Sequence, residues 1–509
     1  MVKELIYKLN NPNYTIYHRA ALGGLAATVQ AWKKNPPLGI NAELTKDQVR
    51  LFWDNAISDQ EALQRILAAS FKLTKDKMID LPGHGITEDK YGLRLAIHNG
   101  ITSTFLQHPK MRPTKEKEAR RVELKTADQE TGDFFTYRPI DTYAHQQAQG
   151  TDLLLDKWKG LFPSTANITQ SLVPGSGGGE KLNTPYDEAV LLFFLIVGTS
   201  IFLLRPRNYQ EKAQACIVVP DVIDLVAFAK ALHRIAQAGI DLKRFSNTYL
   251  NRVVGGAEEA ALRFLIDLQT ESITNERSVK GCQAIAMGKV AWDKNQVNRS
   301  ISVSLENDYP ELEIFQAAYK YLGTSKIIKT KKGENYAIPN SPVPELIAAN
   351  LAAKRHWASH FINLVSDKKD FNNIRYSQGG LVAMKDAIKD EEDKLIIQVF
   401  QQAWKFTMGA LYDRATREST DPERLLEVER ERMRNAILRT KNVDALSNWF
   451  LRFCADATKG NSLPSLAENS SQVRNFIFNQ RNFERFQNLC LFALLSYKSD
   501  SKTTSGGKN

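Results

Sequence analysis

The stretch TIYHRAALGGLAATVQAWKK, residues 15–34, has the pattern of a helix whose middle carries almost no bulky side chains. Glycine costs roughly 1 kcal/mol relative to alanine in a helix interior, so the pair Gly23-Gly24 weakens this helix unless close packing offsets the cost. A helix this slim lets another backbone approach closely. Two partners remain open: a segment of the same chain, or a nucleic-acid backbone or partner subunit, in which case residues 17–19 supply the nearest polar groups.

The chain divides by composition into two parts. Residues 1–345 mix helix signals with strand patterns, which predicts an α+β domain. Residues 346–509 carry helix signals and no convincing strand, which predicts an all-α C-terminal helical bundle. The boundary is placed in KTKKGENYAIPNSPVPE, because three prolines and a charge cluster are typical of a linker.

Capping signals and apolar spacing predict individual elements within these parts. TKDQ at residue 45 and SDQE at residue 58 both have capping-box spacing, which favours a helix after each. Strands are predicted within residues 124–140 and in ACIVVPD, CQAIAMGKVAW and RSISVSLEN. Helices are predicted at residues 15–34, 45–53, 58–73, 421–441 and 473–490.

Cysteine content and hydropathy narrow the class of protein. Four cysteines lie far apart without a CxxC pair, which argues against a zinc module or a disulfide scaffold and suits a reducing cytoplasm. The most apolar run, AVLLFFLIVGTSIFLL, has sixteen residues, fewer than the roughly 20 that a membrane-spanning helix needs. We therefore expect a cytoplasmic protein with no membrane association.

No motif for catalysis or cofactor binding stands out. GSGGGEK lacks the Gly-Lys-Ser/Thr spacing of a phosphate-binding P-loop. His356 and His360 have the i,i+4 spacing of metal ligands, but no third ligand is evident, so a packed or surface pair is the simpler interpretation. The sequence predicts no enzyme, no metal and no cofactor; an enzyme with an unrecognised site is the remaining alternative.

The balance of charge favours a polyanionic partner. The formal net charge is +11, from 68 basic and 57 acidic residues. Residues 110–125 hold seven basic side chains against three acidic ones, and a second basic cluster precedes the predicted boundary. Each cluster is either a solvated surface or a contact to a nucleic-acid backbone. The backbone candidates in this part are Arg112, Arg120, Arg121, Lys329, Lys331 and Lys332.

Two predicted C-terminal helices carry arginines in a regular pattern. In VRNFIFNQRNFERFQNLC, helical spacing gathers phenylalanines on one side and arginines on the other. Planar guanidinium groups suit phosphate oxygens, which they bind in pairs. Glutamates in DPERLLEVERERMRNAILRTK leave open whether its arginines are satisfied internally. The backbone candidates here are Arg430, Arg434, Lys441, Arg474, Arg481 and Arg485.

Short phrases along the chain resemble one known family. IYHRAALGGLAATVQAW, MIDLPGHG and NGITSTFLQHPK resemble the N-terminal signature of the large subunit of the type I CRISPR Cascade complex, in its Cas-eight branches of the type I-B and Myxococcus-type systems. KGCQAIAMGKVAW and NLAAKRHWASHFINLV resemble that family's central strands and the entry to its C-terminal bundle. The resemblance extends from about residue 14 to residue 365.

This resemblance implies a non-catalytic subunit that takes part in RNA-guided DNA recognition. Its N-terminal domain would dock on the 5′ handle of the guide crRNA and read the protospacer-adjacent motif in target double-stranded DNA. Its C-terminal bundle would resemble the Cascade small subunit and hold the target or displaced strand of the R-loop. The implied partners also include the Cascade backbone and handle-binding subunits, and a recruited helicase-nuclease or, in transposon-linked systems, a transposition adaptor.

Base-edge reading needs amide, hydroxyl or cationic side chains on ordered loops. The candidate readers of the adjacent motif are Asn99, Gln107, Lys110, Lys181 and Asn183. A protein of another class, a standalone RNA-binding or structural protein unconnected with a guide, remains the alternative. Recovery of a discrete guide RNA would distinguish the two.

The C-terminal part also contains a candidate internal translation start. Relatives in type I-B systems often make their small subunit from within the large-subunit gene. Met384 follows the break SQGG and precedes a predicted helix, so a start there gives a fragment of 126 residues. A non-methionine start at Val382 is a second possibility, and an ordinary methionine at 384 is the third.

Overall fold

The computed structural model describes most of the chain and divides it into two compact units. The first unit comprises Met1–Asn307 with Ser325–Asn340, and the second comprises Asp308–Thr324 with Ser341–Asn509. The described residues are 3–33, 35–106, 112–124, 133–142, 161–162, 184–204, 214–237, 253–270, 277–286, 299–304, 311–329, 335–459 and 463–498.

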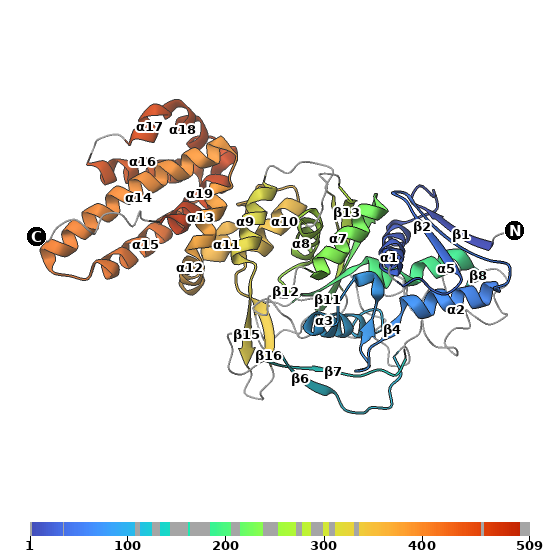
Figure 1. The fold of residues 1–509 in the computed structure, drawn as a ribbon. Helices are drawn as coiled ribbons and strands as arrows, with labels where there is room; N and C mark the ends of the chain where they lie inside the picture. Colours follow the sequence, from blue (N-terminus) through green and yellow to red (C-terminus); the bar gives the residue numbers. More distant parts are fainter. Residues whose placement is uncertain are drawn as a thin grey trace, which may run out of the picture. The chain divides into compact units, whose positions relative to one another are not determined.

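The predicted α+β class with a helical C-terminal part is confirmed (Figure 1). The predicted boundary at 345 is misplaced, because it falls inside helix α10 (Val343–Ala352). Pro342 occupies the N-cap position of this helix, and Pro344 lies in its first turn, where a missing N–H costs nothing. The same prolines that suggested a linker therefore begin a helix of the second unit, while the preceding hairpin, β15 (Ser325–Lys329) and β16 (Asn335–Pro339), belongs to the first.

A three-stranded antiparallel sheet begins the first unit, and it corrects one predicted helix. Residues 45–53 form a turn and the central strand instead of a helix, because the buried residues Val49, Leu51 and Trp53 follow the two-residue period of a strand. The Thr45 hydroxyl accepts from the Gln48 N–H at 3.1 Å, which closes a tight turn as readily as it would cap a helix. The strands, in sheet order, are β1 (Lys3–Lys8), β3 (Gln48–Trp53) and β2 (Ile40–Leu44).

A five-stranded sheet follows, and it contains the strands predicted from ACIVVPD, CQAIAMGKVAW and RSISVSLEN. All neighbouring pairs are antiparallel except the first. Helix α8 (Ala257–Thr270) packs on one of its central strands. The strands, in sheet order, are β12 (Val253–Val254), β10 (Ser200–Leu204), β11 (Gln214–Val222), β13 (Val279–Ala286) and β14 (Arg299–Ser304).

The long apolar run is divided among several buried elements. It contributes to helix α5 (Tyr186–Phe193), the short helix α6 (Leu195–Gly198) and strand β10. Among the helices that the structure describes, none combines the length and apolarity that crossing a membrane requires.

Helix α1 (Ile16–Trp32) explains the small residues at the start of the chain. Its small side chains are buried, and they let α6 lie directly against it. A Cβ atom on Gly24 would overlap the carbonyl oxygen of Phe194 and lie 2.6 Å from the Gly198 nitrogen, and one on Gly198 would overlap the carbonyl oxygen of Ala20. Of the two alternatives for this stripe, packing within the chain is therefore the one that the structure shows. At the polar end, Arg19 binds Asp221 at 2.5 Å.

The remaining small elements of the first unit surround these sheets. Helix α7 follows β11 and packs on α1. Their bounds are α2 (Asp59–Ser70), β4 (Lys72–Leu73), β5 (Ile79–Asp80), the 3-10 turn η1 (Pro82–His84), α3 (Tyr91–Thr102), β6 (Arg120–Leu124), β7 (Asp133–Tyr137), β8 (Leu161–Phe162), β9 (Thr184–Pro185) and α7 (Leu225–Gln237). The predicted capping role of Ser58 is confirmed, because its hydroxyl accepts from the Glu61 N–H at 3.1 Å.

The second unit is a helical bundle built around a long helix, α14 (Glu391–Glu418), and a buried one, α19 (Phe483–Ser496) (Figure 1). Residues 473–490 do not form the single helix that was predicted, because α18 ends at Ile477 and a turn precedes α19. The other elements are α9 (Leu312–Leu322), α11 (Phe361–Val365), α12 (Lys368–Arg375), α13 (Gln378–Asp386), α15 (Pro422–Arg439), α16 (Val443–Thr458), α17 (Pro464–Glu468), α18 (Ser470–Ile477) and η5 (Gln480–Asn482).

The α1–α6 contact predicts opposite effects of two Gly→Ala substitutions. Gly24→Ala should lower the free energy of unfolding by about 1–3 kcal/mol, the usual cost of overpacking a full core. Gly409→Ala is the control, because Gly409 lies inside α14 with no atom near its Cβ position, and it should raise stability by roughly 0.5–1 kcal/mol. Chemical denaturation measures both, and a Gly24→Ala protein as stable as the unsubstituted chain would refute the close contact.

Candidate nucleic-acid interface

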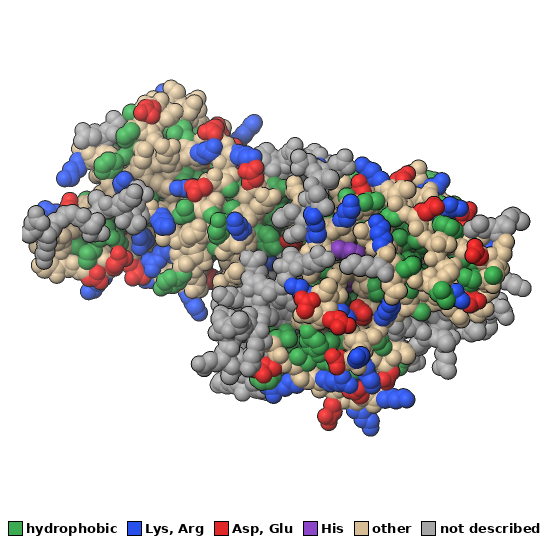
Figure 2. Space-filling view, in the orientation of Figure 1, with side chains coloured by type: hydrophobic (Ala, Val, Ile, Leu, Met, Phe, Trp, Pro, Cys, Tyr) green, Lys and Arg blue, Asp and Glu red, His purple; other side chains and the backbone are tan. Residues whose placement is uncertain are grey.

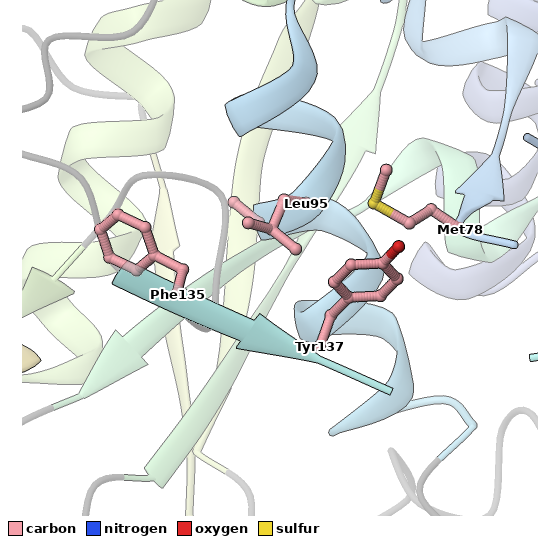
Figure 3. Packing of buried hydrophobic residues seen from close by; sticks show 5 residues of the cluster. Met78, Leu95, Phe135 and Tyr137 are labelled. Atoms are coloured by element: carbon pink, nitrogen blue, oxygen red, sulfur yellow. The ribbon is translucent and has the colours of Figure 1, made fainter. Parts of the chain in front are cut away.

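The β6–β7 hairpin has one buried and one open face. Phe135 and Tyr137 of β7 point toward Leu95 of α3 and pack with Met78 and Ala96 (Figure 3). Because successive side chains of a strand alternate, the residues between them point the other way. The open face is formed by Arg121, Glu123, Phe134 and Thr136.

Arg120 and Arg121 were predicted to serve the same role, but the structure separates them. Arg120 lies on the packed side, where Nε and Nη2 bind the two carboxylate oxygens of Glu116 at 3.0 and 2.7 Å. Hydrogen bonds from Arg120, and then from Lys77, lower the pKa of Glu116. The charge of Arg120 is thus neutralised by Glu116, and Arg120 helps to anchor the hairpin.

Arg121 points outward and is exposed. Its guanidinium carbon lies 3.9 Å from the ring centroid of Phe134, which is itself 41% exposed. Arg121 forms no ion pair with any residue that the structure describes. A cation and an aromatic ring are therefore displayed together on a supported hairpin, an arrangement that suits a phosphate and a base.

The predicted readers of the adjacent motif are only partly within the described residues. Asn99 lies on α3, where its amide donates to the Thr136 carbonyl at 3.0 Å and so ties the helix to β7.

Two of the predicted backbone contacts of the first unit also lie within the described residues. The Arg112 Nε donates to the Leu106 carbonyl at 2.7 Å, and burial lowers the pKa of Arg112. Lys329 ends strand β15. Gln107, Lys110, Lys181, Asn183, Lys331 and Lys332 lie outside the described residues.

Arg485, which was predicted to contact nucleic acid, binds three carboxylates within the second unit. Its Nε donates to the Asp393 carboxylate at 2.9 Å, and Asp393 is fully buried. Its remaining nitrogens lie 2.8 Å from Asp390 and 3.1 Å from Glu392. Because the helix breaks between α18 and α19, Arg485 does not share one face with the arginines before the break.

Asp393 accepts hydrogen bonds from three side chains in two segments of the bundle. His356 Nε2 and Trp357 Nε1 each donate to Oδ2 at 2.8 Å, while Arg485 binds Oδ1. Burial would raise the pKa of Asp393, but the hydrogen bond and charge of His356, with the charge of Arg485, outweigh burial and lower it. His356 and His360 precede α11 in a turn, so they are not the i,i+4 pair of a helix.

The other C-terminal candidates differ in accessibility. Arg474 on α18 and Arg481 in η5 are exposed and form no ion pair with described residues. Lys441 is exposed just beyond α15. Arg430 is half-buried on α15, and Arg434 is buried. Figure 2 shows basic side chains mixed with acidic ones on the visible surface of each unit.

A basic groove in the second unit escaped the sequence prediction. It has a volume of about 500 Å³ and lies along α14 and the ends of α13 and α19. The lining residues on α14 recur at i, i+4, i+7 and i+11 in KLIIQVFQQAWK, a helical spacing that could have revealed the groove. Lys385 lies 3.7 Å from Asp386, and Lys394 lies 2.7 Å from Glu391. The charged and amide lining residues include Lys385, Asp386, Lys394, Gln398, Gln401, Lys405 and Lys498.

The buried histidines of the first unit serve the fold. The Ile79 N–H donates to His98 Nδ1 at 3.1 Å, which leaves Nε2–H to donate to the Arg138 carbonyl at 2.9 Å. Burial lowers the pKa of His98, and likewise that of His84, to about 4. Over the described ranges, no group of three His, Cys, Asp or Glu side chains is placed to hold a metal ion.

Comparison with known families assigns a similarity to each unit. Residues 6–193, in the first unit, match a family model described as the DevT N-terminal domain. Residues 384–509, in the second unit, match one described as the DevT C-terminal domain. The chain is therefore similar to DevT proteins in both of its units. No curated protein matches it.

The Asp393 network predicts which arginine substitutions destabilise the second unit. Arg485→Gln and Asp393→Asn should both destabilise the unit, Arg485→Gln by about 3–5 kcal/mol, since it leaves the buried Asp393 carboxylate without its guanidinium partner. Arg474→Gln and Arg481→Gln, the matched controls, should change stability by less than about 0.5 kcal/mol. Chemical denaturation of each full-length variant measures these differences.

The same network predicts a pH dependence. The pKa of Asp393 is lower in the folded state than in the unfolded state. The ionised carboxylate therefore contributes fully to folding stability above the ordinary carboxyl pKa of about 4, and this contribution is lost as the pH falls through the folded-state pKa. The stability difference between the unsubstituted chain and Asp393→Asn should therefore shrink in acid. A difference that stays constant down to pH 2 would contradict the assigned charge state.

Proposed function

We propose that this chain is the non-catalytic large subunit of a CRISPR RNA-guided DNA-recognition complex. The observation that carries the proposal is the open face of the β6–β7 hairpin, where Arg121 and Phe134 present a cation and an aromatic ring together. The resemblance of the chain's phrases to the Cascade large subunit supports it, and so do the two DevT domain matches.

In this proposal, base pairing with the guide crRNA supplies sequence specificity, and the protein reads a short motif and the shape of the target double-stranded DNA. The first unit docks on the guide handle and reads the protospacer-adjacent motif, with Arg121 on the duplex backbone. The remaining partners are the Cascade backbone and handle-binding subunits, and a helicase-nuclease or a transposition adaptor that acts after recognition in the cytoplasm.

The second unit is proposed to hold the target or displaced strand of the R-loop. Arg474 and Arg481 are available to phosphates, as are the exposed lysines Lys405 and Lys498 of the basic groove. Phosphate contacts of this kind position a strand without reading its sequence.

The nucleic-acid surface of the first unit is tested with two arginines in similar settings. Arg121→Gln should weaken target binding by the assembled complex and reduce the salt slope of log K by about 0.9, the value for one lost duplex phosphate contact. Arg50→Gln is the control, because Arg50 also lies over a ring, that of Phe52 at 4.8 Å, but binds Glu4 and Glu43. Equal binding by both variants at two salt concentrations would remove Arg121 from the interface.

Assembly with the guide is tested by co-expression with Cascade backbone and guide-processing subunits. Purification through a tag on this chain should recover one discrete guide RNA and the other subunits. Heterogeneous RNA, or no RNA, would favour the alternative of a standalone RNA-binding or structural protein.

We also propose that a small subunit is made from an internal start at Met384. The DevT C-terminal match begins at the same residue, and helix α14 follows from Glu391 as predicted, but the expected break SQGG forms the start of α13, within which Met384 lies buried. A fragment from Met384 lacks His356 and Trp357, so Asp393 would lose two of its donors.

A C-terminal tag on the native gene tests this start. It should reveal a second band of about a quarter of the full mass, since 126 of 509 residues remain. The band should disappear when Val382 and Met384 are recoded. A band that persists after recoding, or no short band at all, would contradict the internal start.

A further inference from the structure

One buried arginine of the second unit has hydrogen-bond donors that the fold does not use. Arg434 on α15 is 6% exposed, and its Nη2 donates to Asn435 Oδ1 at 3.0 Å. Its Nε and Nη1 have no hydrogen-bond partner among the residues that the structure describes. Leaving buried donors of a charged group unsatisfied is costly, so such donors call for an explanation, and a bound anion is one that suits a guanidinium group.

Two further arginines lie near this group. Arg430 is one helical turn away on α15 and half-buried, and burial and then the positive charge of Arg375 lower its pKa. Glu423 and Glu427 act on Arg430 in the opposite direction. None of the three guanidinium groups, those of Arg375, Arg430 and Arg434, forms an ion pair within the part of the chain that the structure describes.

Helix α12 holds this arrangement against α15. The Arg434 guanidinium lies 5.4 Å from the ring centroid of Phe371 on α12, and Lys368 of α12 binds Glu431 of α15 at 2.6 Å. At the end of α12, the Arg375 guanidinium lies 5.6 Å from the ring of Tyr376, which is 80% exposed. Arg375 thus lies beside an open aromatic ring.

We propose that Arg434, with Arg430 and Arg375, binds a backbone phosphate of single-stranded nucleic acid, while Tyr376 stacks on the adjacent base. Guanidinium groups bind phosphate oxygens in pairs, and a base stacks on an aromatic ring whatever its identity. The site deepens the proposed function and rests on it. It assigns strand holding to the α12–α15 surface, apart from the groove along α14.

The test uses the full chain, a single-stranded oligothymidylate and inorganic phosphate. Arg434→Met removes the unpaired donors but keeps the length of the side chain, so the variant should unfold no more easily than the unsubstituted chain. Phosphate should raise the unfolding temperature of the unsubstituted chain and not that of Arg434→Met. Oligonucleotide affinity should fall about tenfold, with the salt slope reduced by about 0.7 for one lost single-strand contact.

Arg432→Gln is the matched control, because Arg432 is on the same helix but exposed and bound to Glu429 at 2.7 Å, and it should behave like the unsubstituted chain. Arg430→Gln and Arg375→Gln repeat the test at accessible positions in case Arg434→Met misfolds. Tyr376→Ala should weaken oligonucleotide binding and leave the phosphate effect intact.

Three outcomes would overturn the site. Equal affinity and salt slope for Arg434→Met, Arg430→Gln and the unsubstituted chain would remove the arginines from binding, while the proposed function would stand. A phosphate effect without any change in oligonucleotide binding would reduce the site to one for small anions. If polyglutamate competed for the site as strongly as the oligonucleotide does, the site would be assigned to an acidic protein partner. Failure of the unsubstituted chain, alone and in the assembled complex, to bind any nucleic acid would instead refute the proposed function.

Discussion

The buried carboxylate of Asp393 is the interaction on which the helical unit depends. It lies in the first turn of α14 and accepts hydrogen bonds from the chain before α11 and from α19, so one group joins segments that are 92 residues apart. A buried anion is tolerable only when its donors are all in place, so these segments must assemble together. The edge-on contact of Trp357 with Phe492, at 4.9 Å between ring centroids, packs the apolar core beside this network.

The basic residues of the chain fall into two groups, according to whether each has a carboxylate partner in the fold. Arg120 and Arg485 have carboxylate partners and hold local structure, whereas Arg121, Arg375, Arg430 and Arg434 form no ion pair with any residue that the structure describes. Net charge therefore says little about which cations can meet a polyanion. What matters is whether the folded chain has already neutralised them.

The sequence was informative where one physical signal dominated. The small residues of α1 and the capping spacing of α2 are local signals, and α1, α2, β14 and α15 formed as predicted. Residues 45–53 were mispredicted because a Thr-x-x-Gln spacing serves a turn as well as a helix. The role of Arg485 depends on Asp393, 92 residues away, and no local pattern records that partner. The groove was missed, although the regular spacing of its lining residues along α14 was visible in the sequence.

The central claim is that unneutralised cations beside exposed aromatic rings mark the surfaces that contact nucleic acid. Photo-crosslinking tests it most directly, using the assembled complex, target DNA that carries photoreactive nucleotides, and mass spectrometry of the linked peptides. The account predicts linked peptides from the β6–β7 hairpin around Phe134 and from the end of α12 around Tyr376. Efficient crosslinking elsewhere on the chain, with none at either of these two rings, would contradict it.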